Sequence, residues 1–118
     1  MADDAPLKAL VLDANIVIRA VLGQRVRGIL EAYCDRVRFF APQAAFADAR
    51  QYLPELLRRR GIDIQAAMEV LDRIGAIVQP IELEEYGEFE RLARQRVRDV
   101  DDWQVLALAL ALNAPVWT

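Results

Sequence analysis

The sequence contains no histidine among its 118 residues. Histidine is the side chain that most often acts as a general base near neutral pH, and it completes both the Ser-His-Asp triad and many metal sites. Its absence excludes those kinds of site from this chain. Any chemistry must therefore depend on carboxylates, hydroxyls or a bound ion.

Cysteine and long hydrophobic runs are also scarce. Cys34 is the only cysteine, so the chain cannot form an internal disulfide. We therefore expect the protein to work in a reducing compartment, and we expect Cys34 to fill a small apolar space in the core. The acidic start MADDAPLK differs from the basic start of a signal peptide. The longest apolar run, residues 105–112, is too short to cross a bilayer. These features predict a cytoplasmic protein that does not enter a membrane.

Lysine is nearly missing as well, since Lys8 is the only one among 15 basic residues. The others are arginines, with runs at 58–60 and within 91–98, and the planar arginine fork suits phosphate. A net charge of −3 argues against a protein that holds nucleic acid through bulk positive charge. Local basic faces remain, and solvated helix faces are the alternative explanation of these runs.

Short β-branched runs alternate with longer helical patterns along the whole chain. The short runs predict strands at 10–12, 37–42, 75–80 and 114–118. Apolar residues spaced three and four apart predict helices at 16–33, 43–59, 63–74, 83–96 and 101–112. The first of these is either one helix or two helices separated near Gly23. This alternation predicts one α/β domain over residues 1–118, a three-layer α/β/α sandwich around a parallel sheet of about four strands.

A carboxylate, Asp13, interrupts the first apolar stretch, KALVLDANIVIRAVLG. Asp13 lies where the first predicted strand gives way to a helix, and ligands of open parallel sheets bind beyond the carboxyl ends of the strands. A carboxylate beside an apolar core is costly unless a cation or hydrogen-bond donors meet it. Capping of the helix near Ile16 is the structural alternative, because Asp is a favoured N-cap residue.

Three more aspartates precede the most apolar helical pattern, in RDVDDWQVLALALAL. Asp99, Asp101 and Asp102 make the first turn of a buried helix densely negative. One acidic residue would be enough to cap that helix. Repelling carboxylates crowded against a buried helix favour a bound divalent cation.

A further aspartate, Asp48, lies within a helical pattern and is surrounded by alanines. Aspartate is a poor residue for a helix interior, and the small neighbours would allow a ligand or another element to come close. An ordinary exposed aspartate paired with Arg50 or Arg58 is the alternative.

Taken in order, the stretches VLDANIVIRAVLG, APQAAFADARQYL and RDVDDWQVLALALALNAPVWT resemble a PIN domain, the nuclease fold of VapC-type toxins, over nearly the whole chain. The resemblance implies carboxylates that converge to bind Mg²⁺ or Mn²⁺ and cleave RNA. It also implies a homodimer, and a small antitoxin that blocks the acidic pocket with an inserted arginine. Oxygen-only ligands suit such hard cations, which lower the pKa of bound water.

The acidic positions of the family fall on particular residues of this sequence. The first corresponds to Asp13. The second falls on Asp48, where the family usually has Glu, so the shorter side chain weakens or shifts the metal. The third falls on Asp102, with Asp101 and Asp99 as supporting candidates.

The end of the chain departs from the family pattern. In the family, a strand ending in Thr, as VWT does at Thr118, is commonly followed by another Asp within a few residues, and this sequence stops there. We expect that strand to be buried beside the first one, which places Thr118 next to Asp13. A fourth acid is then either absent or located beyond Thr118, and we expect the 118-residue chain to bind divalent ions weakly.

Two alternative functions remain. An aspartate after a strand also resembles the haloacid-dehalogenase-type phosphatases, where a second Asp follows two residues after the nucleophile. Here Asn15, which fits the small polar position of the PIN pattern, stands in its place, so the proton-transfer group is missing. The stronger alternative is a PIN-like module with a degraded site, which binds RNA or a protein partner without cleaving.

Overall fold

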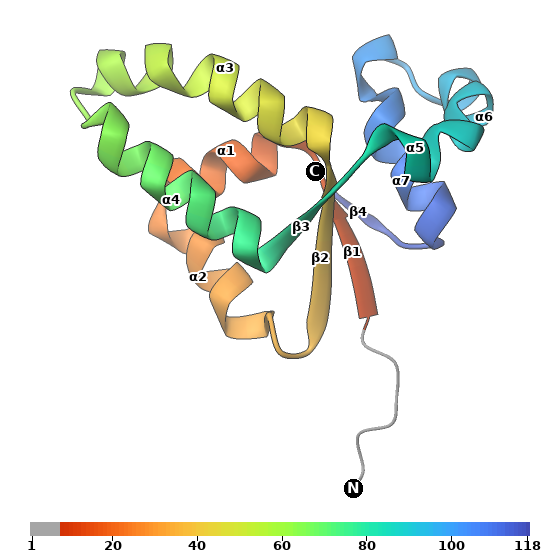
Figure 1. Ribbon diagram of the computed structural model, residues 1–118, viewed down its shortest axis with the longest axis horizontal. Coiled ribbons are helices and arrows are strands. Elements are labelled where there is room, and N and C mark those ends of the chain that lie inside the picture. Colours follow the sequence, from red (N-terminus) through yellow and green to blue (C-terminus); the bar gives the residue numbers. More distant parts are fainter. Residues whose placement is uncertain (1–7) are drawn as a thin grey trace, which may run out of the picture.

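The computed structural model describes residues 8–118 and places a sheet of four strands at the centre of the fold (Figure 1). The strands are β1 (Lys8–Leu12), β2 (Val37–Pro42), β3 (Val78–Ile81) and β4 (Val116–Trp117). Their order is β3-β2-β1-β4, and every neighbouring pair is parallel. This confirms the predicted parallel sheet, and it places β1 between β2 and β4.

One face of the sheet is covered by α1 (Ala14–Leu22), α2 (Gln24–Tyr33), α3 (Gln43–Arg60) and α4 (Ile64–Ile77). The helical pattern at 16–33 is divided in two, because the chain is extended at Gly23, whose N–H donates to the Arg19 carbonyl at 2.9 Å. Leu12 and Phe39 point from the strands into the core beneath these helices.

The other face is covered by α5 (Leu83–Tyr86), η1 (Gly87–Phe89), α6 (Glu90–Arg96), η2 (Val100–Asp102) and α7 (Trp103–Leu112). Val11 and Phe40, the sequence neighbours of Leu12 and Phe39, point into this second core. Successive strand residues alternate between faces, so both faces of β1 and β2 are buried. The three-layer α/β/α sandwich is confirmed.

Two predicted boundaries in the second half are wrong. The strand expected at 75–80 begins only at Val78, because α4 continues through Gly75 and keeps Leu71 and Ile74 buried at helical spacing. The helix expected at 83–96 is interrupted by the 3₁₀ turn η1, which starts at Gly87, a residue that weakens a helix.

The C-terminal elements also differ from the prediction. The helix expected from residue 101 starts at Trp103, because Asp99 caps a separate 3₁₀ turn that contains Asp101 and Asp102. The strand expected at 114–118 spans only two residues, and both are half-buried, so the expectation of a buried strand is wrong. The reason is that β4 has only one neighbour, β1.

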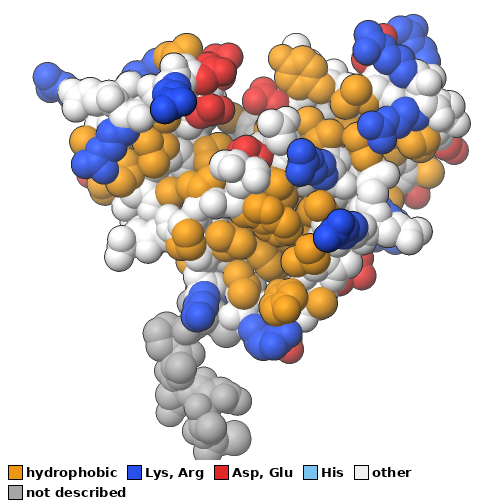
Figure 2. Space-filling view, turned by 180° about the vertical axis from the view of Figure 1, so that it is seen from behind, with side chains coloured by type: hydrophobic (Ala, Val, Ile, Leu, Met, Phe, Trp, Pro, Cys, Tyr) orange, Lys and Arg blue, Asp and Glu red, His pale blue; other side chains and the backbone are white. Residues whose placement is uncertain are grey.

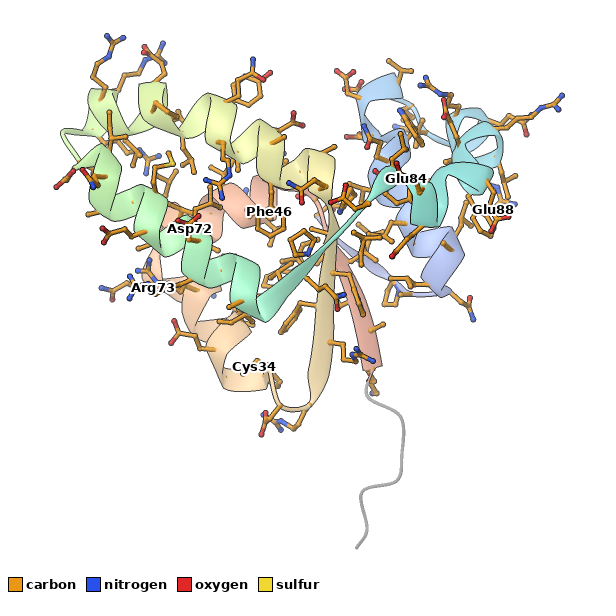
Figure 3. The ribbon with its side chains drawn as sticks, viewed as in Figure 1. Cys34, Phe46, Asp72, Arg73, Glu84 and Glu88 are labelled. Carbon is orange, nitrogen blue, oxygen red and sulfur yellow. The ribbon has the colours of Figure 1, made fainter. Side chains whose placement is uncertain are left out.

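Cys34 lies at the end of α2 and is exposed, so the expectation that it fills apolar space is wrong (Figure 3). Its thiol donates to the Glu31 carbonyl at 3.3 Å, as a residue in the last turn of a helix can. Within residues 8–118, no helix is both long enough and apolar enough to span a bilayer.

Candidate active site

Asp13 directly follows β1 and caps α1. Its Oδ1 accepts a hydrogen bond from the N–H of Ile16 at 3.0 Å, and its own N–H donates to the Trp117 carbonyl at 3.4 Å. The structural alternative is therefore confirmed, because Asp13 is an N-cap. The cap engages one carboxylate oxygen, so the second oxygen remains able to bind a cation.

Asp99 performs a similar local task before α7. Its Oδ1 accepts from the N–H of Asp101 at 3.0 Å, which holds the turn η2 that carries Asp101 and Asp102. Asp99 thus acts by shaping the turn. The two following carboxylates are both exposed at the start of the α7 layer.

Asp48 is exposed on α3, and the arginines considered as its partners bind other carboxylates. Arg50 pairs with Asp72 on α4 at 2.8 Å, and Figure 3 shows Asp72 on the helix that runs alongside α3. Arg58 pairs with Glu55 on its own helix. The ion-pair explanation of Asp48 is therefore wrong.

These segments meet at a cleft of about 230 Å³ beyond the carboxyl ends of the strands. Figure 2 shows acidic side chains around an indentation between the two helical layers. The sequence-predicted residues that line the cleft are Asp13, Asn15, Asp48, Asp101 and Asp102. They come from the β1–α1 junction, from α3 and from η2, segments far apart in the sequence.

Two predicted site residues lie outside the lining of this cleft, Asp99 and Thr118. Thr118 nevertheless directly follows Trp117, which pairs with Leu12 in the parallel register and whose carbonyl accepts the N–H of Asp13 at 3.4 Å. The expected position of Thr118 next to Asp13 stays a prediction that this register supports.

Asp102 shows that the carboxylates interact. The side chain of Asp102 is exposed. Its pKa is nevertheless raised above the ordinary value, mainly by partial loss of solvent and, to a smaller extent, by repulsion from Asp99, Asp13 and Asp101. Asp13 and Asp102 belong to opposite helical layers, so this repulsion acts across the cleft. A cation bound between them would remove it.

A closed cation cage is absent from the part of the chain that the structure describes. Within residues 8–118, no three acidic or thiol side chains lie close enough together to hold a metal ion by themselves. The convergence of Asp13, Asp48 and Asp102 onto one ion therefore stays a prediction. Their common cleft has the acidic, oxygen-only lining that the prediction requires.

Besides Asn15, two cleft residues carry polar but uncharged groups, Tyr52 and Gln104, and sequence reasoning missed both. Tyr52 lies four residues after Asp48, one helical turn further along the same face of α3, so helical spacing could have found it. Gln104 accepts a hydrogen bond at Oε1 from the hydroxyl of Tyr86 at 2.5 Å. That contact joins elements 18 residues apart in the sequence, and no local pattern signals it.

The structure is a parallel α/β/α fold with an acidic cleft at the carboxyl edge of its sheet, which is where open α/β sheets bind their ligands. A family model described as PIN domain matches residues 11–118, nearly the whole chain, and the chain belongs to this family. Among curated protein sequences, none shows significant similarity to the chain.

A solved structure supports the same fold. A chain in the crystal structure of VapBC2 from Rickettsia felis, bound to a DNA fragment from their promoter, superposes with a TM-score of 0.66 and 16% identity. The match covers 93% of this chain and 86% of that chain. At this identity the likeness establishes the fold, and the sequence prediction of a PIN-like domain is confirmed.

Proposed function

We propose that the chain is a metal-dependent endoribonuclease that cleaves RNA phosphodiester bonds. One observation carries the proposal: Asp13, Asp48, Asp101 and Asp102, from three separate segments, line a single cleft beyond the strand ends. Membership of the PIN domain family supports it, because that family consists typically of metal-dependent nucleases.

The residues of the cleft fit Mg²⁺ or Mn²⁺. Carboxylates and the amide oxygen of Asn15 are hard oxygen ligands, and the chain has no histidine to favour other metals. Asp13 and Asp102 would hold the ion, with Asp48 and Asp101 bound directly or through water. Mg²⁺ keeps several waters and needs only one or two carboxylates, so the lack of a three-acid cluster in residues 8–118 is compatible with such a site. The bound ion would supply charge neutralisation at the phosphate and acidify an attacking water.

The residues of the chain itself would orient the substrate. Gln104 has Oε1 engaged by Tyr86, so its amide nitrogen is the atom that remains to donate to a phosphate or a base. Asp48 is exposed on the opposite wall, where its carboxylate would hold the ion directly or orient the attacking water. The cap formed by Asp13 would hold its carboxylate in place during this step.

We also propose a homodimer and a small antitoxin partner. The likeness to a VapBC2 chain supports the antitoxin partner, and the acidic cleft suits an inserted arginine, whose fork pairs well with carboxylates. The homodimer rests on the family resemblance of the sequence alone. Light scattering tests the dimer, and a monomer at high concentration would contradict it. We place this activity in the cytoplasm.

A second candidate is a PIN module that binds RNA or protein without cleaving. It is supported by the shorter acid at position 48 and by the absence of a three-acid cluster within residues 8–118. The two candidates differ in one respect, because only the nuclease should break an RNA chain when Mn²⁺ is added.

The deciding experiment is cleavage of a labelled single-stranded RNA by purified protein with Mn²⁺ or with EDTA. Wild type should cleave only with Mn²⁺, and Asp13→Asn should be inactive. Asp63→Asn is the matched control, because Asp63 caps α4 through Gln65 at 3.0 Å and does not line the cleft. Equal cleavage by Asp13→Asn and wild type would contradict the proposal, and Mn²⁺ binding without cleavage would favour the second candidate.

A further inference from the structure

A second hollow, of about 420 Å³, continues the acidic cleft. It shares part of its lining with the cleft, namely Ala44, Asp48, Tyr52, Asp101 and Gln104. It then extends to residues that the cleft does not contain, namely Arg94, Val100 and Trp103. The two hollows therefore form one groove, with Asp13 and Asp102 at one end, Asp48 and Asp101 where the hollows overlap, and Arg94 at the other end.

Arg94 is the only basic side chain among the described residues that line either hollow. Its guanidinium carbon lies 4.9 Å from the centre of the Trp103 ring, and its Nε donates to Glu90 at 2.7 Å. Trp103 is itself buried and packs against Tyr86, with ring centres 6.1 Å apart. The guanidinium is thus held in place, while its terminal nitrogens take no part in the bond to Glu90 and suit a phosphate oxygen.

Two exposed apolar side chains line the same hollow and come from different helical layers. Tyr52 on α3 is 57% exposed, and Val100 on η2 is 56% exposed. A single exposed apolar residue needs no explanation. An aromatic ring together with a second apolar surface, beside a fixed arginine, has the components that bind a nucleotide of a single strand: a face for the base and a cation for the backbone.

We infer that this hollow binds one unpaired nucleotide of the RNA next to the bond that is cleaved, with its base stacked on Tyr52 and its phosphate bound by Arg94. The inference rests on the proposed function for the identity of the ligand. A base within a duplex is stacked between its neighbours and cannot lie against Tyr52, so the groove selects single-stranded RNA. Arg94 also offsets the repulsion between the phosphate chain and the acidic end of the groove.

Binding of a fluorescent single-stranded RNA, followed by anisotropy, tests the stacking. All proteins carry Asp13→Asn, so that cleavage does not disturb the measurement. Tyr52→Ala should weaken binding at least about fivefold, the lower end for loss of one stacked base. Tyr52→Phe keeps the ring and should bind within about twofold of the parent. Tyr33→Ala is the matched control, because Tyr33 is an exposed tyrosine on α2 outside the groove.

The arginine is tested in the same way with a second matched pair. Arg94→Gln should weaken binding and make the negative slope of log affinity against log salt shallower by about 0.7, as expected for one lost phosphate contact on a single strand. Arg59→Gln should change neither value, because Arg59 pairs with Glu55 four residues earlier in its helix but lies outside the groove.

An RNA series with one abasic position moved along the strand identifies the stacked base. When the missing base is the one that stacks on Tyr52, the RNA should bind the parent protein more weakly. The same RNA should bind the Tyr52→Ala protein as well as the intact RNA does. Equal binding by the Tyr52→Ala and Tyr33→Ala proteins, or an equal loss of single-stranded and duplex RNA binding, would overturn the inference. Undiminished RNA binding together with loss of a protein partner would assign the groove to that partner instead.

Failure of this inference and failure of the proposed nuclease function give different results. If wild-type protein cleaves RNA with Mn²⁺ but Tyr52→Ala binds RNA normally, the subsite is wrong and the nuclease stands. If binding depends on Tyr52 but no RNA is cleaved, the subsite stands and the chain is a binding module.

Discussion

Asp13 has two separable roles, and substitutions at this position should separate them. Its carboxylate caps α1 by accepting the N–H of Ile16 at 3.0 Å, and we propose that it also binds the metal. Asn caps a helix about as well as Asp, whereas Ala cannot cap. Asp13→Asn should therefore remove the charge that binds the metal and keep the cap, while Asp13→Ala should remove both.

The expected cost of the lost cap follows from its surroundings. Ile16 is 1% exposed, so its N–H has little access to water once the carboxylate is gone. Loss of an N-cap costs about 1 kcal/mol, within a range of about 0.5–2 kcal/mol. For a domain of this size, that corresponds to a decrease in Tm of about 4 °C. Asp13→Asn loses a negative charge that interacts favourably with the dipole of α1, but it also removes repulsion between Asp13 and Asp102. Because these two effects oppose each other, the Tm of Asp13→Asn should stay within about 2 °C of wild type.

Thermal unfolding followed by circular dichroism in EDTA measures the cap, and calorimetric titration with Mn²⁺ measures the metal site. The Asp63→Ala protein, which loses the cap of α4, should be destabilised like Asp13→Ala but should bind Mn²⁺ normally. Equal Tm values for Asp13→Ala and Asp13→Asn would refute the role of the cap. Unchanged Mn²⁺ affinity in Asp13→Asn would refute the role as ligand.

Three further outcomes are expected. Because the pKa of Asp102 is raised in the folded state, the folded protein binds a proton at this carboxylate more readily than the unfolded chain does. The contribution of Asp102 to stability should therefore increase as the pH falls through that pKa. Asp102→Asn should abolish this increase in acid unfolding curves measured in EDTA. Tyr86→Phe loses the hydrogen bond to Gln104 and should lower the free energy of unfolding by about 1 kcal/mol in urea, whereas no change would show that the bond is neutral. Leu53→Ala should cost about 2–5 kcal/mol, because Leu53 is fully buried, and a loss below about 1 kcal/mol in the same assay would contradict the packing.

The acidic cleft could be predicted largely from the sequence. Asp13 follows an apolar strand, and in a parallel sheet that position lies at the edge where ligands bind. The apolar helix after them marked the aspartates before α7 as crowded carboxylates, and the resemblance to PIN domains assigned them to the same site as Asp13. What the sequence could not show is the spacing of the carboxylates, which depends on how α3 and η2 approach each other from opposite layers.

The second hollow could not be predicted, for a related reason. Arg94 belongs to an arginine-rich stretch in which no residue differs visibly from the others. It is distinguished by its position over Trp103, which the packing of α6 against α7 creates. Boundaries near glycine were the other source of error, because Gly75 continues a helix while Gly87 begins a 3₁₀ turn, and packing of the neighbouring residues decides between these outcomes.

The central claim is that the carboxylates of the cleft bind a divalent cation, and anomalous diffraction from crystals soaked in Mn²⁺ tests it most directly. The account predicts an anomalous peak in the cleft, about 2.0–2.6 Å from oxygens of Asp13 and Asp102, and no peak at the same place in crystals of Asp13→Asn. An empty cleft at saturating Mn²⁺, or a peak held by other residues, would contradict it.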